Sequence, residues 1–299
     1  MVKKIKLSDF VADFISKQGV KTVFAISGGA SLHLIHSIND HKSLNYVCTH
    51  HEQGAAMAAD GYSRVTGNIG VAISTSGPGA TNLITGLCCS FYDSVPLLVI
   101  TGQVSTFRMT GKTGVRQIGF QETPITAMTK EITKYSKTIK DPYEILYELE
   151  KATYLAFEGR QGPVLLDIPD NLQRELIDIS KLKKFSKKVF KKKSKKYLSI
   201  REAASDLLRL IQNSKRPVAI GGWGLHLSKT EKLFVKFVRY FSLPVALTWG
   251  ASDVLPSDDP LYIGTFGTHG MRHANFAVQN SDLIISLGSR LDTKATGSP

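Results

Sequence analysis

The sequence predicts an α/β protein with doubly wound parallel sheets in two consecutive domains. Short apolar runs typical of buried strands alternate with longer stretches of helical periodicity along the 299 residues. Strands that alternate with helices favour a mainly parallel sheet covered by helices on both faces. The length also exceeds one ordinary domain of about 100–200 residues and suits two.

The first predicted domain covers residues 1–170. Ser8 is a candidate helix N-cap, apolar residues recur after it at helical spacing, and Gly19 ends that helix. The polar stretch 103–129 has few periodic apolar positions, and its length predicts a functional loop region. The other predicted elements are strands at 23–26, 45–49, 69–74, 97–101 and 164–168, and helices from Ser31 and at 51–65 and 142–157.

A basic linker, residues 171–198, is predicted to follow. Residues 181–197 hold ten lysines and no acid, and without them the formal net charge falls from +13 to +3. The basicity is therefore one local run, which favours a solvated linker. Binding of nucleic acid or of a membrane surface by this run is the alternative interpretation. We expect neither a nucleic-acid partner nor a membrane partner.

The second predicted domain, residues 199–299, has fewer strands than a doubly wound domain normally carries, so we expect it to be incomplete. Its first helix runs to Gln212, and a Gly221-Gly222-Trp223-Gly224 turn follows its first strand. The predicted elements are helices at 199–212 and 230–241 and strands at 217–220, 245–248 and 282–287.

The three cysteines, Cys48, Cys88 and Cys89, cannot form a disulfide framework and lack the spacing of zinc ligands. Their apolar neighbours predict reduced side chains in the core. The N-terminal segment lacks the apolar centre of a signal peptide, and no apolar run approaches the ~18 residues of a membrane span. We therefore expect a soluble, cytoplasmic protein.

Glu52 is the first residue with a pattern suited to chemistry. The segment 50–56, HHEQGAA, places its carboxylate where a predicted strand passes into a helix. Ligands of open α/β sheets bind beyond the carboxyl ends of strands. Because the helix dipole also favours an acid there, an acid without a chemical role is the alternative.

Two further segments are candidates for the same site. Residues 74–82, STSGPGATN, again join a strand to a helix, and free N–H groups at a helix start suit an anion or a polar ring. A tight turn built for geometry alone is the alternative. Gly119-Phe120-Gln121-Glu122 lies in the polar loop region, where an aromatic side chain beside an amide can shape a substrate pocket.

Taken together and in order, five segments resemble the thiamine-diphosphate enzymes of the acetolactate synthase group. The resemblance covers essentially the whole chain and implies a pyrimidine-binding domain followed by part of a central domain. Members also have a diphosphate-binding domain, and in many the central domain holds FAD. The segments are HEQGAAMAADGYSRVTG (51–67), STSGPGATNLITG (74–86), PLLVITGQV (96–104), GFQETP (119–124) and GRQGPVLLDIP (159–169).

The resemblance implies a catalytic role for Glu52. The glutamate at its position hydrogen-bonds N1′ of the cofactor's aminopyrimidine ring and promotes loss of the thiazolium C2 proton, so it relays protons. Phe120 and Gln121 match the family's pair beside the reacting carbon. The matching cofactor positions are Gly29, Pro78 and Asn82 near the pyrimidine ring, and Arg160 beside FAD.

FAD is a second candidate cofactor, in the second domain. The third glycine of a G-x-G-x-x-G pattern would fall on Leu227, which disfavours an NAD site at the glycine-rich turn. Loss of FAD with retention of the fold is the alternative. The candidate contacts are Gly221, Gly222, Gly224, Thr268, His269 and Arg290.

Departures from the group leave the acceptor substrate open. Asp170 stands where a lysine is common, Lys294 where an arginine is, and Thr268 where methionine is frequent. The family holds the diphosphate through Mg²⁺ bound to a Gly-Asp-Gly motif, which this sequence lacks. We therefore assign no metal ligand in this chain, and we expect Mg²⁺ and the diphosphate-binding domain to come from a longer protein or a partner chain.

The leading hypothesis is a thiamine-diphosphate-dependent carboligase or lyase that acts on a 2-keto acid such as pyruvate. The resemblance places the cofactor between subunits, which implies a homo-oligomer, at least a dimer, or a partner chain. The first alternative is a non-catalytic interaction subunit that keeps the fold without cofactor turnover. The second is a flavin- or nucleotide-binding oxidoreductase.

Overall fold

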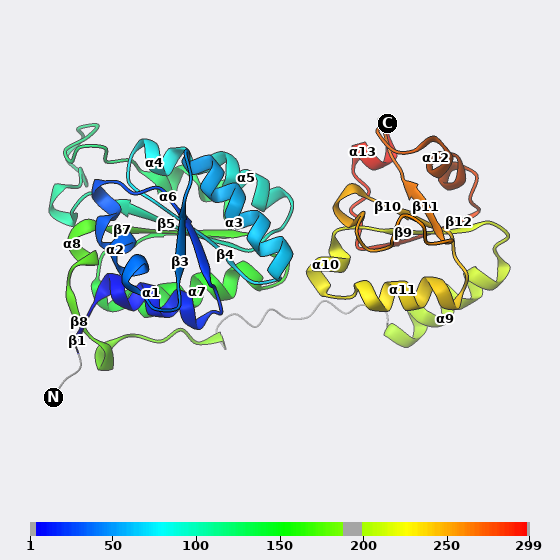
Figure 1. Cartoon of the computed structure of the whole chain (residues 1–299), viewed down its shortest axis with the longest axis horizontal. Coiled ribbons are helices and arrows are strands. Elements are labelled where there is room, and N and C mark those ends of the chain that lie inside the picture. The colour runs from blue at the N-terminus through cyan, green and yellow to red at the C-terminus, as the bar shows by residue number, and fades with distance from the viewer. Residues whose placement is uncertain (1–3, 188–198, 298–299) are drawn as a thin grey trace. The chain divides into compact units, whose positions relative to one another are not determined.

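The fold consists of two units, seen in a computed structural model that describes residues 4–187 and 199–297 (Figure 1). The units cover residues 1–191 and 192–299, and each is built on its own parallel sheet with helices around it. The predicted α/β class with two doubly wound sheets is therefore confirmed. Residues 188–198 of the predicted basic linker lie outside the described residues.

The first unit is built on a six-stranded, wholly parallel sheet with strand order β3-β2-β4-β5-β7-β6. Of its four inner strands, β4, β5 and β7 are buried along their whole length, which explains why they read as unbroken apolar runs. The bounds are β2 (Thr22–Ala25), β3 (Asn45–Cys48), β4 (Gly70–Ser74), β5 (Leu97–Gln103), β6 (Tyr135–Thr138) and β7 (Pro163–Pro169).

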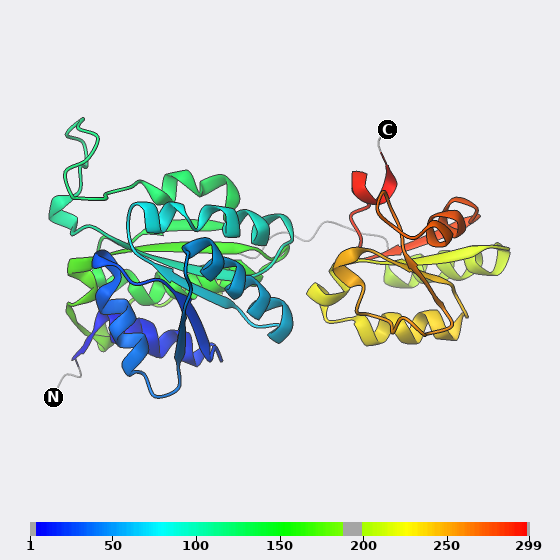
Figure 2. The same cartoon turned by 45° about the horizontal axis from the view of Figure 1, so that its top comes forward.

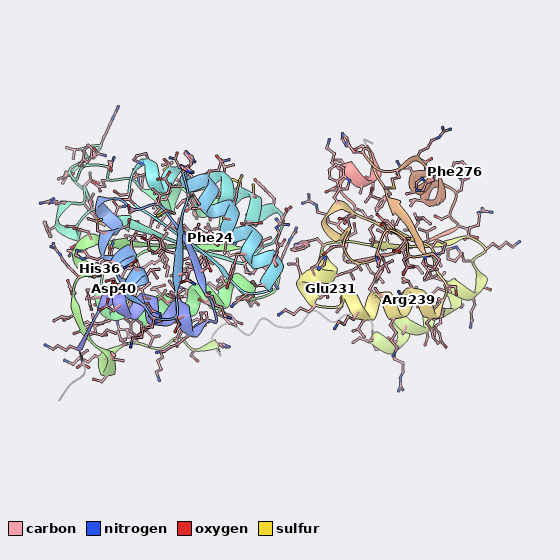
Figure 3. The ribbon with its side chains drawn as sticks, viewed as in Figure 1. Phe24, His36, Asp40, Glu231, Arg239 and Phe276 are labelled. Carbon is pink, nitrogen blue, oxygen red and sulfur yellow. The ribbon has the colours of Figure 1, made fainter. Side chains whose placement is uncertain are left out.

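Helices cover both faces of this sheet. Successive strand residues point to opposite sides, so a strand that is apolar throughout presents apolar side chains to both layers of helices. Leu98 and Ile100 of β5 pack with α1 (Leu7–Lys17), α2 (Leu32–Asp40) and α7 (Ile145–Phe157). Leu97 and Val99 pack on the other face with α3 (Glu52–Thr66), α5 (Ile84–Tyr92) and α6 (Ile125–Met128). Phe24 on β2, labelled in Figure 3, meets the ring of Tyr62 on α3 edge-on, with the ring centroids 6.2 Å apart.

A two-stranded antiparallel ribbon closes the first unit. It pairs β1 (Lys4–Lys6) with β8 (Leu176–Asp178), which follows the short helix α8 (Asp170–Gln173). The first unit thus continues past residue 170, where the sequence placed the end of the domain. The strand in this stretch has only three residues, too few for a periodic pattern, and it is held by backbone pairing to β1 and by the buried side chain of Ile177.

The second unit has a four-stranded parallel sheet in the order β11-β10-β9-β12. A capping box of Ser199 and Glu202 starts its first helix. Phe276 on α12, labelled in Figure 3, is 68% exposed. The bounds are α9 (Ile200–Asn213), β9 (Pro217–Gly221), α10 (Gly224–Ser228), α11 (Glu231–Tyr240), β10 (Val245–Leu247), β11 (Tyr262–Thr265), α12 (Arg272–Gln279), β12 (Leu283–Leu287) and α13 (Thr293–Thr296).

The prediction that the cysteines lie in the core is wrong. Cys48 and Cys89 are exposed and Cys88 is partly exposed. Cys48 lies on the edge strand β3, whose four residues are all exposed, and α5 buries only one side of an apolar sequence. None of the helices within residues 4–187 and 199–297 is long and apolar enough to cross a membrane.

Candidate active site

The candidate site lies in the first unit, at the carboxyl edge of its sheet. Glu52 is the first residue of α3, which begins just after β3. His51 caps this helix: its backbone is extended, and its ring Nδ1 accepts a hydrogen bond from the Gln53 amide at 3.2 Å. The acid therefore stands where the helix dipole favours negative charge.

Asn82 fixes the half-buried carboxylate of Glu52. Its Nδ2 donates to Glu52 Oε2 at 2.9 Å. Asn82 follows the short helix α4 (Pro78–Thr81), which Pro78 starts after Gly77. A Cβ on Gly79 would lie 2.7 Å from Ser74 Oγ and 3.3 Å from Glu52 Oε1, so the helix can approach these oxygens only with a glycine there.

Ser74, the last residue of β4, supplies a polar group that the fold does not use. Its Oγ is fully buried and has no hydrogen-bond partner within the part of the chain that the structure describes. Such orphaned groups are rare and call for an unseen ligand or water. Next to it, Thr75 Oγ1 accepts from the Ala30 amide at 3.2 Å, which brings the Gly28–Ala30 turn to the same place. A Cβ on Gly29 would meet nothing within 4 Å, so that position faces open space.

Gln121 reaches the same cluster from the loop after β5. Its backbone is left-handed, with φ at 64°, and so is that of Gly77, at 59°. A Cβ on Gly77 would lie 2.7 Å from Gln121 Cβ. The two turns can therefore pack this closely only because residue 77 has no side chain. Phe120 beside it is 83% exposed. The structure thus brings Glu52, Asn82, Gly77 and Gln121 into one cluster.

A buried carboxyl that the sequence reading missed lies in the strands behind this cluster. Asp167 on β7 accepts hydrogen bonds from Thr101 Oγ1 (2.7 Å), Gln103 Nε2 (3.0 Å) and Thr138 Oγ1 (3.1 Å). Gln103 Nε2 also donates to the Thr123 carbonyl at 2.9 Å, which ties the loop of Gln121 to the sheet. Burial raises the pKa of Asp167 to about 6, although the three donors lower it in part. The signal in the sequence is an acid inside the apolar run VLLDIP.

Arg160 lies away from this cluster. Its Nε donates to Ser94 Oγ at 2.7 Å, and both residues precede strands of the sheet, β7 and β5. They therefore lie at the amino edge, opposite Glu52. Its contact with FAD stays a prediction.

In the second unit, the glycines of the predicted FAD turn pack against the chain itself. Gly222 N donates to Leu287 O at 3.0 Å and Gly224 N to Gly288 O at 2.8 Å. A Cβ on Gly222 would lie 2.6 Å from Gly288 O. Close packing of two backbones therefore accounts for these two glycines, and both amides already have acceptors. A cavity of about 310 Å³, with mainly apolar walls, lies beside Gly224 and Gly288.

The other predicted FAD contacts lie after β11 and β12, at the carboxyl edge of the second sheet. Thr268 N donates to Lys294 O at 2.7 Å, and Thr268 Oγ1 lies 3.0 Å from His269 Nδ1. Arg290 Nε pairs with Asp292 Oδ2 at 3.0 Å. The gap between β9 and β12 is the switch point of this sheet, where doubly wound folds bind ligands.

Family models match both units. The model for the thiamine pyrophosphate enzyme N-terminal TPP binding domain matches residues 5–127, and that for the thiamine pyrophosphate enzyme central domain matches residues 204–299. Together the two matches cover most of the chain. The chain belongs to the thiamine pyrophosphate enzymes and comprises an N-terminal domain and central-domain sequence of that family.

Within that family the chain is similar to plant acetolactate synthases. It is 39% identical over 297 residues to the chloroplastic acetolactate synthase of Arabidopsis thaliana, and the aligned region covers 98% of this chain and 42% of that protein. It is 38% identical over 292 residues to chloroplastic acetolactate synthase 3 of Brassica napus, covering 98% and 43%. The chain spans less than half the length of these curated relatives.

Proposed function

We propose that this chain supplies the pyrimidine-binding domain and central-domain sequence of a thiamine-diphosphate-dependent carboligase or lyase that acts on a 2-keto acid such as pyruvate. The observation that carries the proposal is the Glu52 carboxylate, held by Asn82 beside the unpartnered hydroxyl of Ser74. An aminopyrimidine ring carries both donors and acceptors, and this set of groups suits it. The similarity to acetolactate synthases supports the reaction class.

Glu52 moves the proton in this proposal. With Oε2 held by Asn82, Oε1 has no hydrogen-bond partner among the described residues and is the oxygen that holds a proton at N1′ of the pyrimidine ring. Thiamine diphosphate, when bound, supplies the nucleophilic carbon that adds to the keto group. Gly29 and Pro78 border the ring, and Gln121 with Phe120 faces the incoming substrate.

Mg²⁺ and FAD belong to the same proposal. Within residues 4–187 and 199–297 no group of three or more His, Cys, Asp or Glu side chains can hold a metal ion. We expect Mg²⁺ to bind with the diphosphate, on a further domain or a partner chain. For FAD we propose contacts within the second unit, with Gly221 and Arg290 at the switch point and Thr268 and His269 in the loop that follows β11.

The surface of the first unit supports an oligomer. Large apolar side chains are exposed on the edge strand β3 and on helices α3 and α5. Exposed apolar groups of this kind often mark a protein–protein interface, because removing them from water is favourable. We propose that a second subunit covers them and encloses Glu52. The residues and their exposed fractions are Tyr46 (37%), Val47 (46%), Met57 (40%), Val65 (88%) and Tyr92 (58%).

The test is Glu52→Gln, measured in the protein combined with its diphosphate-binding domain. Glutamine keeps the size and the bond to Asn82 but cannot exchange a proton with N1′. We expect thiamine diphosphate to bind while hydrogen–deuterium exchange at C2 falls by ~10²–10⁴-fold, the usual contribution of a general acid–base group. Glu175→Gln, which changes an exposed acid, is the control. Unchanged exchange in the Glu52 variant contradicts the proposal, and a wild-type protein that binds no thiamine diphosphate favours the interaction subunit.

A further inference from the structure

The side chain of Ser74, at the end of β4, lies wholly inside the first unit. Its Oγ has no hydrogen-bond partner anywhere in the described chain. The equally buried Ser90, by contrast, donates to Asp60 Oδ2 at 2.7 Å. A hydroxyl that is taken out of water and left unpaired costs free energy, so the Ser74 side chain calls for a partner such as an internal water.

The carboxylate of Glu52 lies within reach of such a water. A Cβ on Gly79 would lie 2.7 Å from Ser74 Oγ and 3.3 Å from Glu52 Oε1. The sum of these two distances, 6.0 Å, is the largest separation that the two oxygens can have. They form no direct hydrogen bond. A single water that bonds to both can span about 6 Å, because each O–H···O distance extends to about 3.0 Å.

Close packing fixes the distance between α3, which carries Glu52, and β4, which carries Ser74. Figures 1 and 2 show α3 lying against the sheet of the first unit. A Cβ on Gly70 in β4 would lie 2.0 Å from the Ala59 carbonyl oxygen in α3, so the backbones of the two elements are already in contact. The space between the hydroxyl and the carboxylate is therefore set by the fold. A water can bridge it, whereas a shift of the helix cannot close it.

A second anchor would complete the orientation of the Glu52 carboxylate. Asn82 Nδ2 holds Oε2 at 2.9 Å. One such bond leaves the group free to turn about its last single bond, a rotation with only weak intrinsic preferences. A bond at Oε1 fixes the plane of the carboxylate. Because each carboxylate oxygen can accept two hydrogen bonds, Oε1 keeps a lone pair for N1′ of the pyrimidine ring.

We propose that Ser74 is a positioning residue, whose hydroxyl holds a buried water on Glu52 Oε1 and so orients the carboxylate toward the pyrimidine ring. This inference rests on the proposed function. A small misalignment of a reacting group lowers the rate of its step strongly. We therefore expect loss of the hydroxyl to slow the proton relay and to leave cofactor binding nearly unchanged.

The first experiment needs only this chain and asks whether Ser74 and Glu52 share a partner. The urea midpoint of unfolding is measured at pH 7 for Ser74→Ala in two backgrounds, the wild type and Glu52→Ala, from the hydrogen exchange of peptides that contain β4. The substitution should lower the midpoint by ~0.3–0.5 M in the wild-type background. In Glu52→Ala the shift should be less than half as large, because the water has already lost its second anchor.

The matched control is Thr153→Val. The Thr153 hydroxyl on α7 is also buried, and it too has no hydrogen-bond partner within the described residues. Its helix packs on the face of the sheet opposite α3, so the control should shift the midpoint equally in both backgrounds. A midpoint of Ser74→Ala that rises, as removal of a dry, unpartnered hydroxyl would cause, or that falls equally in both backgrounds, would overturn the proposal.

The second experiment uses the protein combined with its diphosphate-binding domain. In Ser74→Ala the Kd for thiamine diphosphate and the KM for pyruvate should stay within about twofold of wild type, while C2 proton exchange and kcat fall by about tenfold. Ser74→Cys, which keeps the size but has only a weak donor, should show the same losses. Thr153→Val should show none.

The same substitution in the Glu52→Gln background separates positioning from a general structural effect. If Ser74 acts through Glu52, Ser74→Ala should change the remaining C2 exchange by less than about twofold there. A repeated tenfold loss in that background, or unchanged exchange in Ser74→Ala alone, would overturn the proposal. A wild type that binds no thiamine diphosphate refutes the proposed function instead, and the urea result on this chain is unaffected by it.

Discussion

Replacement of Asp167 by asparagine tests how the centre of the first sheet is held together. The carboxyl group is buried in β7, and burial raises its pKa from 3.8 to about 6 against the opposing effect of three hydrogen-bond donors. Asparagine keeps the size and removes the ionisation. Its amide must also compete with the amide of Gln103, which now donates to Asp167 and to the Thr123 carbonyl at once.

The magnitude follows from the pKa. Because the folded pKa is raised, Asp167 contributes stability that is fully present below pH 3.8 and is lost as the pH rises through 6. The difference between a pKa of 3.8 and one of about 6 corresponds to ~2–3 kcal/mol of free energy. Between pH 4 and pH 7, the free energy of unfolding of the first unit should therefore fall by ~2–3 kcal/mol more in the wild type than in Asp167→Asn.

The assay is urea unfolding of both proteins at pH 4 and pH 7, followed by hydrogen-exchange protection of peptides from β7. Both tryptophans of the chain, Trp223 and Trp249, lie in the second unit, so their fluorescence serves as an internal control that the substitution should leave unchanged. If the difference in stability between the two proteins is the same at both pH values, the reasoning about the buried carboxyl is refuted.

Two further outcomes are expected. Gly102→Ala would place a Cβ 2.0 Å from the Ala30 carbonyl oxygen and should lower the free energy of unfolding by ~3 kcal/mol or more. The control Gly61→Ala adds a Cβ in open space on α3 and should be neutral or stabilising. Thermal unfolding compares the two variants, and equal midpoints would contradict the packing argument. Sedimentation of the complete protein should show at least a dimer, because Val65 and Tyr92 are exposed; a strictly monomeric active enzyme would exclude the proposed interface.

Much of the fold could be predicted because its central strands are buried on both faces. The runs predicted at 69–74, 97–101 and 164–168 agree closely with β4, β5 and β7. The strand β6, with the sequence YSKT, was missed since an edge strand needs no apolar run. The ribbon of β1 and β8 was missed because each of its strands has only three residues, which are too few to give a periodic signal.

Residues of the candidate site could be predicted only where the local sequence around a residue indicated its place in the fold. Glu52 stood out because a strand-to-helix junction lies beside it. Ser74 did not, since a serine at the end of a strand becomes notable only when its hydroxyl proves to be buried without a partner. Asp167 depends on Thr101, which is 66 residues away in sequence, and no local pattern records that contact.

The ribbon of β1 and β8 also has a consequence during synthesis on the ribosome. The N-terminal strand finds its partner only when residues 176–178 have been made, and β5 must wait for β7, some sixty residues later. Pairing across such distances is slow and leaves apolar edges uncovered for a time. The first unit therefore cannot complete its fold until residues 176–178 have been synthesised and have left the ribosome.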